Sequence, residues 1–289
     1  MSLTIYHNAG FFSCCTIKLM NIIEFYNNNQ KIPTSLNCTS QFKDYKSNNE
    51  LHTDITDRFF IVNNSTMLTY IPYIGTVQLT FAPPEFENQF SDYKLLNFPH
   101  MKLFVDQYFS FSEDVNNCVD KLTKKYELEP NNTCAVFYRG NDKCKETVQP
   151  SYDDMISKTK EIIEKYSLTK IILQTDEREF SETFRAVFPE TIVFTEIPDM
   201  PKMMASMQHV IPRDERLLAQ QYYIASLAII AKCKHVVHTS GNGEMWMAFF
   251  RNNSDGLHQY LRPCQFYEWN NNSLNPSFDS NKTYFWIDN

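Results

Sequence analysis

Segments with the patterns of β-strands and α-helices alternate over the second half of the chain. Each short apolar run typical of a strand is followed by a longer stretch with apolar residues at helical spacing. Such alternation is typical of right-handed βαβ units on a parallel sheet, so an α/β fold is predicted. The predicted strands are 133–138, 170–174, 191–195 and 235–239, and the predicted helices are 151–166, 178–188, 214–232 and 244–250.

The first half begins with the same strand–loop–helix order, at 3–7 and 16–25, before a polar and irregular stretch. An amphipathic helix at 113–126 is ended by Glu129-Pro130-Asn131-Asn132. A chain of 289 residues is long enough for two lobes. We therefore predict an N-terminal lobe at 1–128 and a C-terminal lobe at 129–289, with the aromatic-rich final stretch, 260–289, packing back on both.

The composition argues against several classes of partner. The chain has 34 acidic and 27 basic residues, a net charge of −7 and no basic run, which argues against nucleic-acid binding. No apolar segment is long enough to span a membrane, and the N-terminus lacks the features of a signal peptide. The eight cysteines form no C-x-x-C pair, so we expect reduced thiols and a cytoplasmic location.

The motifs of metal sites and of common nucleotide sites do not occur. There is no D-x-D, H-E-x-x-H, G-x-S-x-G or G-x-G-x-x-G, and the seven histidines have no metal-ligand spacing. We therefore predict neither a metal nor a cofactor, and NAD chemistry is disfavoured. Ligands of parallel sheets bind beyond the carboxyl ends of the strands, so a site is expected among the loops that begin there.

The loop after the strand at 133–138 offers the most varied chemistry. Its sequence is Arg139-Gly140-Asn141-Asp142-Lys143-Cys144-Lys145-Glu146. An arginine provides a planar fork for a phosphate, a lysine provides a point charge, and a glycine lets the backbone approach a ligand closely. The same residues also fit a solvated turn, so this loop alone leaves both interpretations open.

The loop after the strand at 235–239 is rich in glycine and hydroxyl groups. Its sequence is Thr239-Ser240-Gly241-Asn242-Gly243, and it leads into a helix whose N-terminal N–H groups suit an anion. Only six glycines occur in the chain and two are here, although a turn with a helix cap gives the same pattern. Two other strand ends are weaker candidates: Thr175-Asp176, and Asn8-Ala9-Gly10-Phe11 in the first half.

Together these loops resemble those of the fucosyltransferase superfamily, which includes core α1,6-, α1,2- and protein O-fucosyltransferases. The family signature H-x-R-R-x-D-K is approximated by F-Y-R-G-N-D-K at 137–143, and the family's A-T-D-D segment by Q-T-D-E at 174–177. The family's serine-rich loop corresponds to 236–243, so the resemblance covers roughly 130–252. Three departures leave the donor's base and sugar open: Phe137 replaces the signature histidine, Gly140 the second arginine, and Ser226 falls near the guanine-binding aspartate.

The resemblance implies a GT-B-like glycosyltransferase, with two Rossmann-like lobes and the nucleotide-sugar site in the C-terminal lobe. It implies metal-independent, inverting transfer of a sugar to a glycan hydroxyl, with fucose from GDP-fucose favoured. Arg139 would bind the diphosphate, Lys143 would support it, and Glu146 would be the catalytic base. The other donor-binding residues would be Gly140, Asn141, Asp142, Thr175, Asp176, Thr239, Ser240, Gly241, Asn242 and Gly243, facing Asn8, Gly10 and Phe11 across the cleft.

Three alternatives stay open beside this interpretation. The first is the same fold with another donor sugar, such as xylose or rhamnose. The second is a non-catalytic glycan-binding relative, which the loss of two signature positions motivates. The third is a different Rossmann-type enzyme, such as a methyltransferase.

Overall fold

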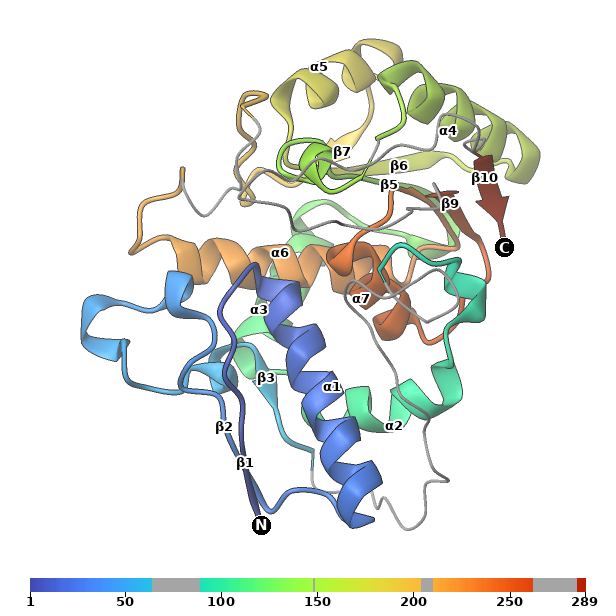
Figure 1. Ribbon diagram of the computed structural model, residues 1–289. Coiled ribbons are helices and arrows are strands. Elements are labelled where there is room, and N and C mark those ends of the chain that lie inside the picture. The colour runs from blue at the N-terminus through green and yellow to red at the C-terminus, as the bar shows by residue number, and fades with distance from the viewer. Residues whose placement is uncertain (64–88, 148, 204–209, 262–284) are drawn as a thin grey trace.

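The computed structural model describes residues 1–63, 89–147, 149–203, 210–261 and 285–289, and its centre is a six-stranded sheet (Figure 1). The strands of this sheet are β5 (Thr133–Tyr138), β6 (Lys170–Thr175), β7 (Ile192–Val193), β8 (His235–His238), β9 (Leu257–Leu261) and β10 (Phe285–Asp288). They lie in the order β10-β9-β8-β5-β6-β7. Strands β5 to β9 pair in parallel, and β10 pairs antiparallel with β9 at the edge.

Four helices connect the parallel strands: α4 (Tyr152–Tyr166), α5 (Arg178–Val187), α6 (Arg216–Ile230) and α7 (Asn242–Arg251). The predicted alternation of strands and helices over 133–250 is confirmed. Local chemistry explains part of this agreement, because the Ser151 hydroxyl accepts a hydrogen bond from the Asp154 N–H in a capping box that starts α4. All six residues of β5 are buried, as expected of a central strand covered on both faces.

The sheet is covered by a different hydrophobic cluster on each face. Along β5, Val136 and Tyr138 pack in a cluster with residues of α4 and α5, whereas Ala135 and Phe137 pack with α6, α7 and the N-terminal elements. This alternation is the period of two expected for a strand. The face toward the N-terminal half is the one on which α6 lies, crossing the middle of the molecule (Figure 1).

The first half consists of helices and two small sheets. Its strands are β1 (Ser2–Thr4), β2 (Ser35–Asn37), β3 (Phe60–Ile61) and β4 (Ser110–Phe111), and its helices are α1 (Phe11–Asn29), α2 (Phe98–Tyr108) and α3 (Glu113–Lys125). β1 pairs with β2 in parallel, and β3 pairs with β4 antiparallel. Within the described residues, these two-stranded sheets are all the sheet structure of 1–128, so a Rossmann-like N-terminal lobe and its boundary near residue 128 stay predictions.

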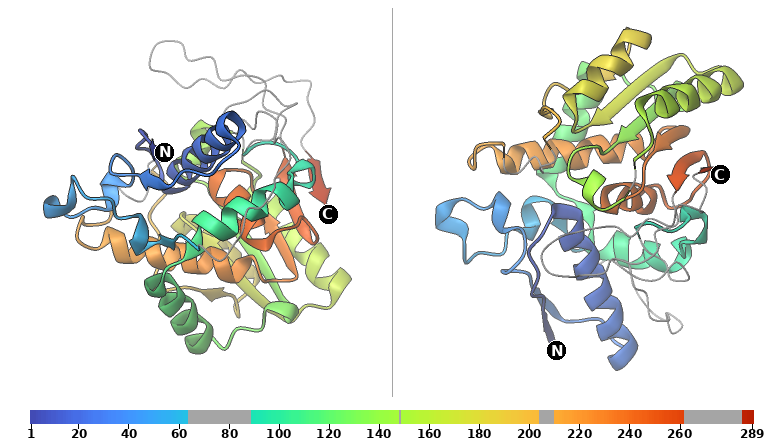
Figure 2. Two further views of the ribbon diagram at one scale, coloured as in Figure 1. Left: turned by 90° about the horizontal axis from the view of Figure 1, so that it is seen from below. Right: turned by 45° about the horizontal axis from the view of Figure 1, so that its top comes forward.

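Helix α1 joins the two halves through buried polar and aromatic contacts. The Trp246 indole N–H donates to the Thr16 hydroxyl (2.9 Å), which donates to Asn242 Oδ1 (3.0 Å). The Phe12 ring stacks on Trp246 with 6.2 Å between centroids. One hydrophobic core thus extends from α1 through α7 to β5, and both views in Figure 2 show α1 beside the C-terminal elements.

The chain end was predicted to pack on both lobes. Its described part, β10, pairs with β9, and Trp286 contacts the Tyr260 ring at 5.3 Å between centroids. The remainder of that prediction, for 262–284, lies outside the described residues. None of the helices in the described ranges is both long and apolar enough to cross a bilayer.

Stability is expected to fall as the pH drops from 7 to 5, because buried histidines line β8 and β9. Burial lowers the pKa of His235 to about 4 and of His238 to about 3. Below pH 6.5 the unfolded chain takes up these protons while the folded protein does not, so stability present above that pH is lost as the pH falls. For the fully buried His238 the loss is about 2 kcal/mol by pH 5.

Urea unfolding of the wild type and of His238→Phe at both pH values measures this effect. Phenylalanine preserves the stacking of His238 on Tyr93 (5.5 Å) and removes the titrating group. The variant should therefore lose less stability on acidification. An identical loss in both proteins would contradict the assignment.

Candidate active site

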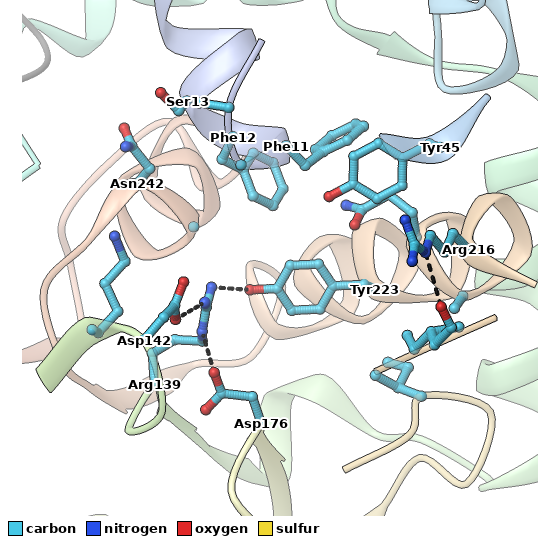
Figure 3. A pocket seen from close by; sticks show the side chains of 18 of the residues that line it. Phe11, Phe12, Ser13, Tyr45, Arg139, Asp142, Asp176, Arg216, Tyr223 and Asn242 are labelled. Atoms are coloured by element: carbon cyan, nitrogen blue, oxygen red, sulfur yellow. Dashed lines mark hydrogen bonds and ion pairs between the residues drawn. The ribbon is translucent and has the colours of Figure 1, made fainter. Parts of the chain in front are cut away.

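A cavity of about 500 Å³ lies at the carboxyl ends of β5 and β6, beside α6 and the first residues of α1 and α7 (Figure 3). From β5 the chain continues through α4 to β6 on one side, whereas β8 and β9 lie on the other side. The strand order therefore reverses between β5 and β8. Ligands of doubly wound sheets bind at such a switch point, so topology and cavity indicate the same place.

Arg139 is the central charged residue of this cavity. It directly follows β5, and its guanidinium donates to Asp176 Oδ2 (2.9 Å), Asp142 Oδ1 (2.7 Å) and the Tyr223 hydroxyl (3.3 Å). An arginine has five N–H donors, so these three bonds to described residues leave two of its N–H groups for a ligand. Burial alone would raise the pKa of Asp142, but Arg139 and Lys143 hold that pKa below its usual value. The guanidinium is thus fixed in orientation and able to bind an anion.

Lys143 and Glu146 form an ion pair at the cavity wall, with 2.5 Å between Nζ and Oε2. Lys143 begins the 3₁₀ turn Lys143–Lys145, and Glu146 directly follows that turn. The two side chains are three residues apart and therefore project to the same side. Among the residues that the structure describes, three cations and three carboxylates line the cavity: Arg139, Lys143 and Arg216, and Asp142, Glu146 and Asp176. The formal charges of these residues balance, so anion binding depends on oriented donors more than on net charge.

The glycine-rich loop before α7 is held by hydrogen bonds that its residues donate to neighbouring parts of the protein. The Thr239 hydroxyl donates to Glu244 Oε1 (2.9 Å), the Ser240 hydroxyl donates to the Tyr260 carbonyl (3.0 Å), and the Gly241 N–H donates to the Tyr93 hydroxyl (3.2 Å). Glu244 is fully buried, which raises the pKa of its carboxyl group. These groups shape the loop, and its last residues reach the cavity.

Nine of the predicted site residues line the cavity: Gly10, Phe11, Arg139, Asp142, Lys143, Glu146, Asp176, Asn242 and Gly243. The other seven are not among its lining residues: Asn8, Gly140, Asn141, Thr175, Thr239, Ser240 and Gly241. Several of these support the wall. The Asn141 amide donates to the Asp176 carbonyl (2.8 Å), the Gly140 N–H donates to Asp176 Oδ1 (3.1 Å), and Thr175 Oγ1 accepts from the Glu177 N–H (3.1 Å). Direct donor binding by these seven residues stays a prediction.

Two of the glycines predicted to admit a ligand are instead packed against carboxylates. A Cβ at Gly140 would lie 2.0 Å from Glu177 Oε2, and one at Gly241 would lie 2.7 Å from Glu244 Oε2. At Gly10, no atom in the described part of the chain lies within 4 Å of the Cβ position. The absence of a side chain is therefore a packing requirement at Gly140 and Gly241, and leaves open space at Gly10.

The sequence patterns missed the contribution of α6. This helix presents Arg216, Ala219, Gln220 and Tyr223 to the cavity, at the i, i+3, i+4 and i+7 spacing of one helical face. Polar residues at this spacing on an otherwise apolar helix were the available signal. The cavity is also lined by residues that were not among the predicted site residues: His7, Phe12, Ser13, Tyr45, Gln89, Gln174, Ile197, Pro198 and Ile211.

Neither a scan against protein-family models nor a search of curated proteins found a match. Among solved structures, the chain is similar to NodZ alpha-1,6-fucosyltransferase soaked with GDP-fucose, with a TM-score of 0.51 and 10% identity over 100% of this chain and 99% of that chain. Fucosyltransferase NodZ from Bradyrhizobium has a TM-score of 0.49 and 10% identity over 99% of this chain and 98% of that chain. POFUT1 in complex with GDP-fucose has a TM-score of 0.38 and 10% identity over 88% of this chain and 70% of that chain. The first of these confirms, at the level of the fold, the resemblance to fucosyltransferases: a mixed α/β fold around a mostly parallel sheet.

Proposed function

We propose that the protein is a glycosyltransferase that binds a nucleoside-diphosphate sugar in this cavity, with its diphosphate on Arg139. The observation that carries the proposal is the guanidinium fixed by Asp142, Asp176 and Tyr223 at the switch point of the sheet. The fold likeness to a fucosyltransferase soaked with GDP-fucose supports fucose as the sugar and GDP-fucose as the donor. A glycan hydroxyl is the proposed acceptor.

The proposed arrangement is GT-B-like, with residues 129–289 forming the donor lobe and 1–128 the acceptor lobe. Gly10 and Phe11 would then face Arg139 across the cavity from the acceptor side, and all three residues line it. Asn242 and Gly243, at the start of α7, would add backbone N–H groups toward the phosphates. The diphosphate is thereby held by donors that are oriented before the ligand binds.

The proposed reaction is a direct displacement with inversion and without a metal ion. The acceptor oxygen attacks the anomeric carbon while the bond from this carbon to the diphosphate breaks, and the nucleoside diphosphate leaves with the electron pair. Arg139 and Lys143 stabilise the charge that develops on the leaving group, because fixed cations need no reorganisation during the reaction. Glu146, positioned by Lys143, takes the acceptor's proton.

Thermal-shift measurements with GDP, UDP and S-adenosylmethionine test the proposal. A ligand at a hundred times its dissociation constant stabilises the folded state by about 2.7 kcal/mol, which corresponds to a Tm increase on the order of 5 °C or more. We expect such an increase with GDP and none with S-adenosylmethionine. Hydrolysis of GDP-fucose, followed by GDP release, should be unaffected by EDTA.

Each other outcome identifies an alternative. Release of a nucleoside diphosphate only from a xylose or rhamnose donor would assign another donor sugar. Glycan binding with no hydrolysis of any donor would indicate a binding module. A response to S-adenosylmethionine alone would replace the proposal with a methyltransferase.

A further inference from the structure

Two buried glutamines line the cavity with amide groups that have no hydrogen-bond partner among the described residues. Gln89 is 1% exposed, and neither its Oε1 nor its Nε2 is bonded. Gln220 is 8% exposed, and its Nε2 is likewise unbonded. Buried amides are almost always hydrogen-bonded in folded proteins, and exceptions require an explanation. A polar ligand in the cavity would supply the missing partners.

Gln220 lies toward the end of the cavity that Arg216 marks. On the cavity face of α6, Tyr223 lies next to the charged residues around Arg139, because its hydroxyl accepts a hydrogen bond from Arg139. Measured from Tyr223 toward the N-terminus of the helix, Gln220 is about one turn away and Arg216 about two turns. Arg216 is therefore roughly 10 Å from Tyr223 along the helix axis. Figure 3 shows Arg216 beside Tyr45, on the other side of Tyr223 from Arg139. This end thus combines N–H donors with an aromatic ring.

Gln89 lies toward the opposite end, near the start of α7. The Tyr93 hydroxyl is 3.1 Å from the backbone carbonyl oxygen of Gln89 and 3.0 Å from the backbone carbonyl oxygen of Gly241. Tyr93 therefore connects the backbone at Gln89 to the loop before α7. Figure 3 shows Ser13 and Asn242 on the far side of Tyr223 from Arg216. This end is lined by amide and hydroxyl groups.

These two environments suit the two ends of a nucleotide sugar. The flat rings of a base stack on aromatic side chains, and its carbonyl oxygens accept N–H donors such as those of Gln220 and Arg216. A sugar hydroxyl is both a donor and an acceptor, and so matches an amide whose oxygen and nitrogen are both unbonded. We propose, on the basis of the function proposed above, that Gln220 recognises the base of the donor and Gln89 recognises the hydroxyls of the transferred sugar.

Binding measurements on Gln220→Leu and Gln89→Leu, with GDP and GDP-fucose and no acceptor, separate the two roles. Gln220→Leu should weaken both ligands by the same factor, about tenfold for one hydrogen bond. Gln89→Leu should leave GDP affinity unchanged and weaken GDP-fucose about tenfold. If UDP raises Tm more than GDP does in the thermal-shift series, the binding measurements use UDP and UDP-glucose in place of GDP and GDP-fucose.

The stability of the free protein provides a second measurement that a structural role would not reproduce. Removing an unbonded buried amide should leave Tm unchanged or raise it. Gln221→Leu is the matched control: it is the next residue on α6, equally buried, but its amide donates to the Arg58 carbonyl (3.0 Å) and it does not line the cavity. This control should lower Tm and leave both affinities unchanged.

The outcomes distinguish failure of the inference from failure of the proposed function. If the wild type binds no nucleoside diphosphate, the proposed function fails. If the wild type binds one, then equal losses for both ligands in Gln89→Leu, or Tm losses in either variant as large as that of Gln221→Leu, overturn the inference. Exchanged effects of the two variants would mean that the ligand lies in the reverse orientation, which also overturns it.

Discussion

Arg139→Lys is expected to lower donor turnover by about a hundred- to a thousandfold. Lysine keeps the positive charge but offers a single ammonium group where the guanidinium bonds Asp142, Asp176 and Tyr223 at once. An ammonium engaged by these carboxylates has no planar fork left for a diphosphate. Charge that develops on the leaving group would then lose its fixed, oriented donors. The loss should appear in kcat/KM for the hydrolysis of GDP-fucose.

Lysine is preferable to alanine for the first test because of the buried carboxylates. Asp176 is 2% exposed and accepts from Arg139, so Arg139→Ala would leave it without its cation and destabilise the fold as well. Arg178→Lys serves as the matched control. Arg178 also pairs with an aspartate, Asp199 at 3.0 Å, but lies outside the cavity lining. Near-normal turnover in Arg139→Lys, with Arg178→Lys also active, would refute the role of Arg139.

The C-terminal half of the fold could be predicted because its signals are local. The strand at Thr133–Tyr138 is a continuous apolar run, and the helix at Tyr152–Tyr166 has a capping box, so neighbouring residues alone define both elements. The first half contains strands of two or three residues, such as Ser35–Asn37. Such short strands exist because a distant partner supplies hydrogen bonds, here at Ser2–Thr4, and this pairing leaves no local signature.

The candidate site was predictable for the same reason, and only in part. Loops that follow parallel strands must meet at one edge of the sheet, and Arg139, Asp176 and Asn242 do so. The face of α6 with Gln220 and Tyr223 depends instead on how that helix crosses the strand ends. Sequence also cannot tell whether a glycine leaves room for a ligand or for a neighbouring side chain. Gly140 is the case in which this distinction has the largest consequence.

Gly140→Ala is expected to destabilise the protein by about 3 kcal/mol and to lower its activity at the same time. The new Cβ would lie 2.0 Å from Glu177 Oε2 and 2.6 Å from Tyr138 Cε1. Glu177 is fully buried and Tyr138 is 2% exposed, so neither side chain can move into solvent without opening the core. The Gly140 N–H also donates to Asp176 Oδ1, and Asp176 holds Arg139. A shift of this backbone would therefore misplace the guanidinium.

Urea and thermal unfolding of Gly140→Ala beside Gly10→Ala measure the effect, with a Tm decrease on the order of 10 °C expected for Gly140→Ala. Gly10 has φ −52° and ψ 151°, which alanine adopts readily, and open space around its Cβ position, so its replacement should change stability by about 0.5 kcal/mol or less. A double-mutant cycle with Glu177→Ala identifies the cause. If the Glu177 carboxylate is the obstacle, Gly140→Ala must cost less when that carboxylate is absent. An unchanged cost would mean that Tyr138, or the backbone itself, requires glycine at this position.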